Sequence, residues 1–137
     1  MFENTNFFTD MEITNHSVAI EIADNLIKHT KEHMVGIYDS ALYDFVEYQL
    51  LISLLTFPAK HDSSSMNKSL NDIRGICVSP DGFIQQVKNL PEDHPSKQYY
   101  NTFSKNDLSV QKNTFKIIAC RLGMIYADSA NQKNNKI

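Results

Sequence analysis

The stretch of residues 39–57 constrains the fold more than any other part of this chain, because its apolar side chains point to nearly every side of a helix. A helix that is apolar all round is normally surrounded by other helices. Asp39 is a favourable N-cap residue and Pro58 cannot continue a helix, so we expect the helix to lie between them. The sequence therefore predicts a helical bundle built around this segment.

Five other segments repeat apolar residues at helical spacing and carry signals for helix starts or ends. We expect a first helix over residues 15–31 and a short fifth helix from Pro95. A fourth helix is expected to have Ser79 as its N-cap and to end at Pro91. The third and sixth helices are defined by apolar stripes, which are Met66, Leu70, Ile73 and Cys77 in the third and Leu108, Phe115, Ile118, Leu122 and Ile125 in the sixth.

These segments predict an all-α fold. The chain has only four glycines and four prolines, which leaves room for long helices, and it shows no strand-like alternation of useful length. We expect a compact orthogonal or up-down bundle of about six helices with a central hydrophobic helix. Residues 1–137 would form a single domain, with residues 1–12 as a flexible lead-in and residues 128–137 as a flexible polar tail.

The sequence carries no motif of a nucleotide-binding or metal-dependent enzyme. Its glycines stand alone, so no glycine-rich loop can hold a phosphate, and no HExxH motif occurs. His29 and His33 have the spacing of paired metal ligands, but a solvated helix end is favoured because no further ligand is near. The SxxK pattern of Ser65 and Lys68 lacks its companion motifs. We therefore predict no catalytic residue, metal or cofactor, and expect that the chain is not an enzyme.

Neither a membrane-spanning segment nor a secretory signal is evident. The longest apolar run, residues 50–57, contains Ser53 and Thr56 and is far shorter than the roughly 20 residues that cross a bilayer. Cys77 and Cys120 are 43 positions apart and form no CxxC motif. Reduced core side chains are their simplest interpretation. We expect a soluble chain, and its cysteines fit a reducing compartment.

The charges are distributed unevenly along the chain. Residues 1–96 hold 6 basic and 14 acidic side chains, whereas residues 97–137 hold 7 basic and 2 acidic ones. Two interpretations are open: the two parts neutralise each other by packing together, or the C-terminal part contributes a basic face to a partner. The sequence alone favours the first but leaves the second available.

Four basic residues are the candidates for such a face. Lys112 and Lys116 are spaced i,i+4 on one flank of the sixth helix, Lys105 precedes them, and Arg121 falls nearer the other flank. They could meet phosphates of DNA or an acidic protein. The alternative is that they are solvated flanks of a helix packed on the core.

Two further features are open to a binding role. Tyr99, Tyr100 and Phe103 could form an aromatic stacking patch, although such a trio more often fixes a short helix to the core. The polar connection of residues 61–68 is a second exposed candidate.

The order of these segments resembles the all-alpha domain of the type IV coupling proteins, the TraG/TraD-like ATPases of conjugation and type IV secretion, and most of all their Gram-positive forms. Residues 8–30, ending in AIEIADNLIKHT, are similar to the helix that follows the family's N-terminal segment. Residues 39–57 resemble the next part of the family's pattern, which is an aspartate and a bulky aromatic residue followed by a long apolar helix. Residues 93–125 resemble its proline-led short helix followed by a helix with Lys112, Thr114 and Arg121. The glycine that often precedes the Lys-Thr pair is absent here, and Asn113 separates the pair.

The resemblance implies a function in recognition. The domain would be an insertion in the nucleotide-binding domain of a membrane-anchored hexameric ATPase. It would be cytoplasmic, at the cytoplasmic end of the assembly, and would make no direct membrane contact. It would recognise a relaxase, an accessory protein of the relaxosome or DNA during DNA transfer, while nucleotide chemistry belongs to the parent's other domain. The alternative is an independent small helical binding protein, such as an immunity factor or a phage-encoded inhibitor.

Overall fold

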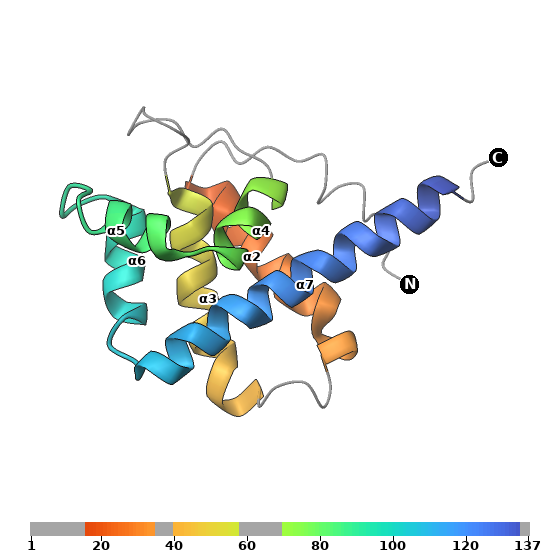
Figure 1. The fold of residues 1–137 in the computed structure, drawn as a ribbon, viewed down its shortest axis with the longest axis horizontal. Helices are drawn as coiled ribbons and strands as arrows, with labels where there is room; N and C mark the ends of the chain where they lie inside the picture. The colour runs from red at the N-terminus through yellow and green to blue at the C-terminus, as the bar shows by residue number, and fades with distance from the viewer. Residues whose placement is uncertain (1–15, 35–39, 58–69, 135–137) are drawn as a thin grey trace.

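The computed structural model describes residues 16–34, 40–57 and 70–134, which form six α-helices and one 3₁₀ helix without any strand. The helices are α2 (His16–Thr30), η1 (Lys31–Met34, the 3₁₀ helix), α3 (Ser40–Thr56), α4 (Leu70–Val78), α5 (Asp81–Val87), α6 (Pro95–Phe103) and α7 (Leu108–Asn134). Helix α7 runs obliquely across α3 (Figure 1). The predicted compact all-α bundle of six helices is confirmed for the described residues.

Helix α3 is the centre of the bundle, as its sequence predicts. It packs against α2, α6 and α7, and every side chain from Leu50 to Phe57 is buried. Figure 1 shows α3 and α6 side by side, with the long α7 crossing the bundle and extending beyond the other helices at its C-terminal end. Among the large apolar side chains described on α3, Phe45 near the start of the helix differs from the others, because it is 68% exposed.

A pair of serines joins α3 to α6 inside the core. The hydroxyl of Ser53 donates to the carbonyl oxygen of Ser96 at 2.7 Å, and the hydroxyl of Ser96 donates to the carbonyl oxygen of Ser53 at 2.7 Å. Both side chains are fully buried. Buried hydroxyls are tolerated where each finds a partner, and this reciprocal arrangement explains why Ser53 can interrupt the apolar run of the central helix.

The aromatic side chains of four elements form one cluster. The ring of Phe83 on α5 lies 4.9 Å from that of Phe57, 5.8 Å from that of Tyr100 and 6.3 Å from that of Phe115. Phe103 contacts both Tyr100 and Phe115. Tyr100 and Phe103 are therefore core residues that fix α6 to the bundle, and no stacking platform is available from them.

Three helix ends differ from the sequence-based expectation. Helix α5 has Pro80 rather than Ser79 as its N-cap, without a side-chain hydrogen bond. It ends at Val87, four residues before Pro91, and turns at Asn89 and Leu90 follow it. Proline disfavours helical backbone in the residue before it, which excludes Leu90 from the helix; the earlier end at Val87 has no explanation in Pro91.

Helix α7 runs to Asn134, beyond the expected end near residue 128. The segment after Asp128 contains neither glycine nor proline, so nothing in its sequence forces the helix to stop. No described helix is both long and apolar enough to cross a membrane. The expected N-cap Asp39, the stripe residue Met66 and residues 1–12 lie outside the described residues.

Candidate functional site

A groove of about 280 Å³ opens between the end of α4, the start of α5 and the first half of α7. Its floor is apolar and is formed by the buried side chains of Cys77 and Phe115, with Ile84 half-buried beside them. Small-molecule pockets are typically about 300–1,000 Å³ and enclose most of their ligand. This groove lies near the lower limit of that range and has exposed walls, an open shape that can accept side chains of a partner.

Two exposed aliphatic side chains form the walls of the groove. Val78, the last residue of α4, is 70% exposed, and Leu108, the first residue of α7, is 72% exposed. Together with Phe45 they are the large hydrophobic side chains that the described part of the chain exposes. Exposed apolar groups that line a common groove are typical of interaction sites.

The assignment of Leu108 to the core stripe of the sixth helix is therefore wrong. The other four stripe residues are buried, as expected; these are Phe115, Ile118, Leu122 and Ile125. Leu108 shares their apolar character but lies at the first turn of α7, where none of the described helices covers it. A helical wheel predicts the direction of a side chain but not how far along the helix its neighbours extend.

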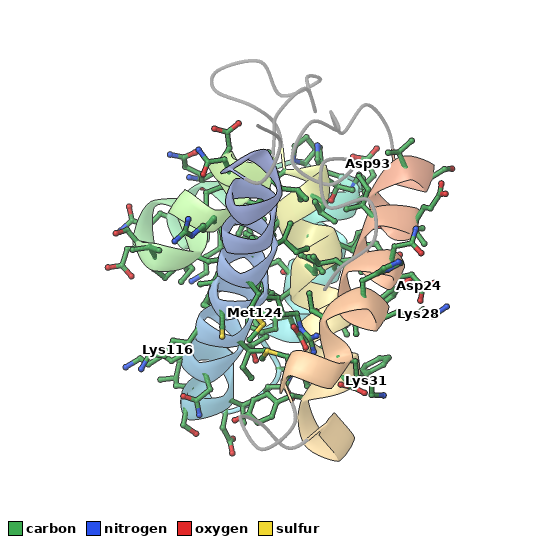
Figure 2. All side chains as sticks on the ribbon, turned by 90° about the vertical axis from the view of Figure 1, so that its right-hand side faces the viewer. Asp24, Lys28, Lys31, Asp93, Lys116 and Met124 are labelled. Atoms are coloured by element: carbon green, nitrogen blue, oxygen red, sulfur yellow. The ribbon has the colours of Figure 1, made fainter. Side chains whose placement is uncertain are left out.

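Two of the four candidate basic residues lie at the groove. Lys112 and Lys116 follow Leu108 at intervals of four residues, so the three form one line along α7. Both lysines are exposed and line the groove. Figure 2 shows Lys116 projecting from the side of α7 that faces away from α2. No ion pair joins either lysine to another described side chain. Among the described residues that line the groove, Asp81 at the start of α5 is the one acidic side chain, so this charged lining is net positive.

Lys105 is exposed but does not line the groove. It lies in the turn between α6 and α7, where its backbone N–H donates to the carbonyl oxygen of Thr102 at 3.3 Å. The side-chain amide of Gln111 holds this turn by donating to the carbonyl oxygens of Ser104 at 3.1 Å and Asn106 at 2.7 Å. These bonds fix the start of α7, and with it the position of Leu108 at the groove.

The fourth candidate, Arg121, is not a surface residue, and its assignment to an exposed basic face is wrong. Its side chain is completely buried, facing α2 and α3. Nε and Nη2 donate to the two carboxylate oxygens of Glu47 on α3, the latter at 3.0 Å. Nη1 donates to the hydroxyl of Thr30 on α2 at 2.6 Å and to the carbonyl oxygen of Ile27 at 3.3 Å.

The Glu47–Arg121 pair connects three helices at the centre of the fold. Burial raises the pKa of the Glu47 carboxyl above its usual value of 4.5, and the guanidinium of Arg121 opposes that rise. The sequence did contain a signal for this pair, because Glu47 lies between buried apolar positions of α3 and Arg121 lies between those of α7. Charges in such positions are rarely buried unless they are paired.

Part of the basic excess of residues 97–137 is therefore neutralised inside the molecule. Arg121 pairs with Glu47 in the core, and Lys97 pairs with Glu92 at 2.7 Å near the start of α6. Lys112 and Lys116 remain exposed. The ion pairs support the first interpretation for Arg121 and Lys97, while a partner for the exposed lysines stays a prediction.

Cys77 is expected to be unreactive in the folded protein. Both cysteines are free thiols, and burial raises the pKa of the Cys77 thiol from its usual 9.0 to about 12. Since the thiolate is the nucleophile, a shift from 9.0 to about 12 lowers its fraction roughly a thousandfold at neutral pH. Iodoacetamide labelling followed by peptide mass spectrometry should show Cys77 modified in urea but protected in buffer. Equal labelling rates in the two conditions would contradict the buried placement.

No group of three or more described His, Cys, Asp or Glu side chains is arranged to hold a metal ion. His29 is exposed, and its Nδ1 lies 2.8 Å from the carbonyl oxygen of Asn25, a contact within α2. The side chain of His33 lies outside the described residues, as do Ser65 and Lys68 and the whole connection of residues 61–68.

Comparison of the chain with protein-family models, with curated proteins and with solved structures finds no match. The groove and its chemistry are therefore the main structural guide to function.

Proposed function

We propose that this chain is a cytoplasmic substrate-recognition domain of a type IV secretion or conjugation coupling protein. The observation that carries the proposal is the groove, in which exposed Val78 and Leu108 are combined with exposed Lys112 and Lys116. Support from the sequence comes from its resemblance to the all-alpha domain of that family. The cargo would be a relaxase, a relaxosome accessory protein or DNA, and the nucleotide-binding domain of the parent protein would be a further partner.

The groove is suited to capture rather than to chemistry. Exposed charges accelerate encounter with a partner of opposite charge and contribute more to association rate and specificity than to affinity. Buried apolar contacts at the centre of an interface contribute most of the affinity. The well-packed bundle beneath the groove presents both kinds of group on helices, which keeps them in place before the partner arrives.

Reversing the charge of both groove lysines is expected to weaken binding of the relaxase–DNA complex by roughly tenfold or more, because an attraction becomes a repulsion. The variant is Lys112→Glu plus Lys116→Glu, and biolayer interferometry over a series of salt concentrations measures the effect. Binding by the natural chain should fall steeply as salt rises.

The matched control is Lys28→Glu plus Lys31→Glu, which changes the net charge equally. Figure 2 shows both control lysines on α2 and the segment after it, on the opposite side of the molecule from Lys116. Their ion pairs with Asp24 and Asp44 are exposed and contribute little stability. Equal loss of binding in both variants would show that only net charge matters. Absence of binding by the natural chain to relaxase, accessory protein and DNA would overturn the proposed function.

A further inference from the structure

We infer that the occupant of the groove is an amphipathic protein helix with an apolar stripe and an acidic flank, and that DNA binds elsewhere if it binds at all. This inference rests on the proposed function, because it names the kind of cargo that the recognition site accepts. It follows from three features of the described groove lining: exposed aliphatic side chains, a line of lysines, and aromatic content limited to the buried Phe115.

The lining residues of the groove on α7 span about as much length as two turns of a partner helix. Leu108, Lys112 and Lys116 lie along two turns of α7, a distance of about 12 Å at 1.5 Å per residue. Val78 lines the same groove from α4. A helix that packs in a groove inserts side chains at i, i+3 or i+4 and i+7, which is a two-turn stripe. The groove can therefore accept one apolar stripe between Val78 and Leu108, above the floor formed by Phe115.

The chemistry of the walls disfavours nucleic acid. Single strands bind by stacking bases on aromatic rings, but the one aromatic ring of the lining, Phe115, is 4% exposed. Duplex DNA is held mainly through its phosphates, and the exposed aliphatic groups of Val78 and Leu108 offer phosphates nothing. The amide nitrogen of Gln111 is already engaged with Ser104 and Asn106. The walls therefore need an apolar partner.

The charges of the groove set the orientation of that partner. Lys112 and Lys116 line the α7 side, and Asp81 lines the α5 side. A partner helix that places acidic side chains four residues apart against α7 would meet both lysines. A second copy of this chain docked face to face would present the same net-positive lining, and charges of the same sign across an interface disfavour that arrangement.

Two designed helical peptides of about 18 residues test the inference, since shorter isolated helices are only marginally stable in water. Both carry leucines at i, i+4, i+7 and i+11; one has glutamates beside this stripe and the other has lysines. The glutamate peptide is expected to bind at least roughly tenfold more tightly, measured by fluorescence anisotropy at low salt. Lys112→Glu plus Lys116→Glu should reverse that preference.

The apolar arm of the test uses Val78→Ser plus Leu108→Ser, which changes only exposed side chains. This variant is expected to bind the glutamate peptide at least roughly tenfold more weakly. Phe45→Ser is the matched control, because Phe45 is equally exposed and lies outside the groove. It should leave peptide binding unchanged, and circular dichroism should show the same helix content for both variants.

Four results would overturn the inference. The first two are failure of the glutamate peptide to bind at about 1 mM and equal binding of both peptides. The third is loss of duplex DNA binding in the variant Val78→Ser plus Leu108→Ser. The fourth is a natural chain that sediments as a dimer while this variant sediments as a monomer. The proposed function fails separately, when the natural chain binds neither relaxase nor accessory protein nor DNA. If the variant Val78→Ser plus Leu108→Ser still binds the cargo, the proposed function stands, but the groove is not the site of binding.

Discussion

Replacing Arg121 with methionine is expected to lower the free energy of unfolding by about 3–5 kcal/mol, because the buried carboxylate of Glu47 would lose its partner. Arg121 makes two hydrogen bonds to that carboxylate and one to Thr30, and its side chain is completely buried. Urea titration followed by far-ultraviolet circular dichroism measures the change, since the chain contains no tryptophan. An effect near zero would mean that the pair is accessible to water.

The double variant Arg121→Met plus Glu47→Met is the control for this prediction. Buried ion pairs replaced by well-packed apolar side chains often give proteins of equal or greater stability. We therefore expect the double variant to recover most of the loss. If it is as unstable as the single variant, the loss comes from the packing of methionine rather than from an unpaired charge.

The pH dependence of the single variant gives a second readout. Burial raises the pKa of Glu47 in the folded chain and Arg121 opposes this, so removing Arg121 raises that pKa further. When the pKa of a carboxyl is higher in the folded chain than in the unfolded chain, the group stabilises the fold at pH values below its pKa in the unfolded chain. This stabilisation is lost as pH rises through its pKa in the folded chain. The free energy of unfolding of Arg121→Met should therefore fall more steeply above pH 4.5 than that of the natural chain.

The sequence predicted the helices well because helix formation is encoded locally. Apolar spacing and the flanking Asp39 and Pro58 marked the central helix, and Pro95 marked the start of α6, where the ring of His94 accepts a hydrogen bond from the backbone of Ser96. These signals lie within a few residues of the element that they define. They required no knowledge of how the helices pack.

The candidate site was only partly predictable, because it depends on contacts between distant segments. Lys112 and Lys116 were placed correctly on an exposed flank of their helix by the wheel alone. Arg121 was misplaced because its partner, Glu47, is 74 positions away and only the packing of α3 on α7 brings them together. Leu108 was misplaced because nothing in its own helix shows where the covering helices end.

The groove itself has no linear signature. Its walls come from the last residue of α4 and the first residue of α7, and Asp81 comes from a third helix. Each of these residues is unremarkable where it stands in the sequence. Their functional interest arises from being exposed together, and that is a property of the folded chain alone.

Truncating Phe103 to alanine is expected to cost about 3–5 kcal/mol of the free energy of unfolding, the range for large aromatic residues in a packed core. The ring of Phe103 is fully buried and lies 5.8 Å from that of Tyr100 and 5.9 Å from that of Phe115. Its loss would leave a cavity between α6 and α7, behind the floor of the groove. Urea denaturation monitored by circular dichroism gives the magnitude.

Phe45→Ala is the matched control, because it removes the same atoms from a ring that is 68% exposed. Surface substitutions of this kind usually change stability by no more than about 0.5 kcal/mol. A loss in Phe45→Ala as large as that in Phe103→Ala would contradict the burial of the aromatic cluster. If Phe103→Ala remains folded but binds the glutamate peptide more weakly than Phe45→Ala does, the aromatic cluster supports the groove as well as the fold, since Phe115 belongs to both.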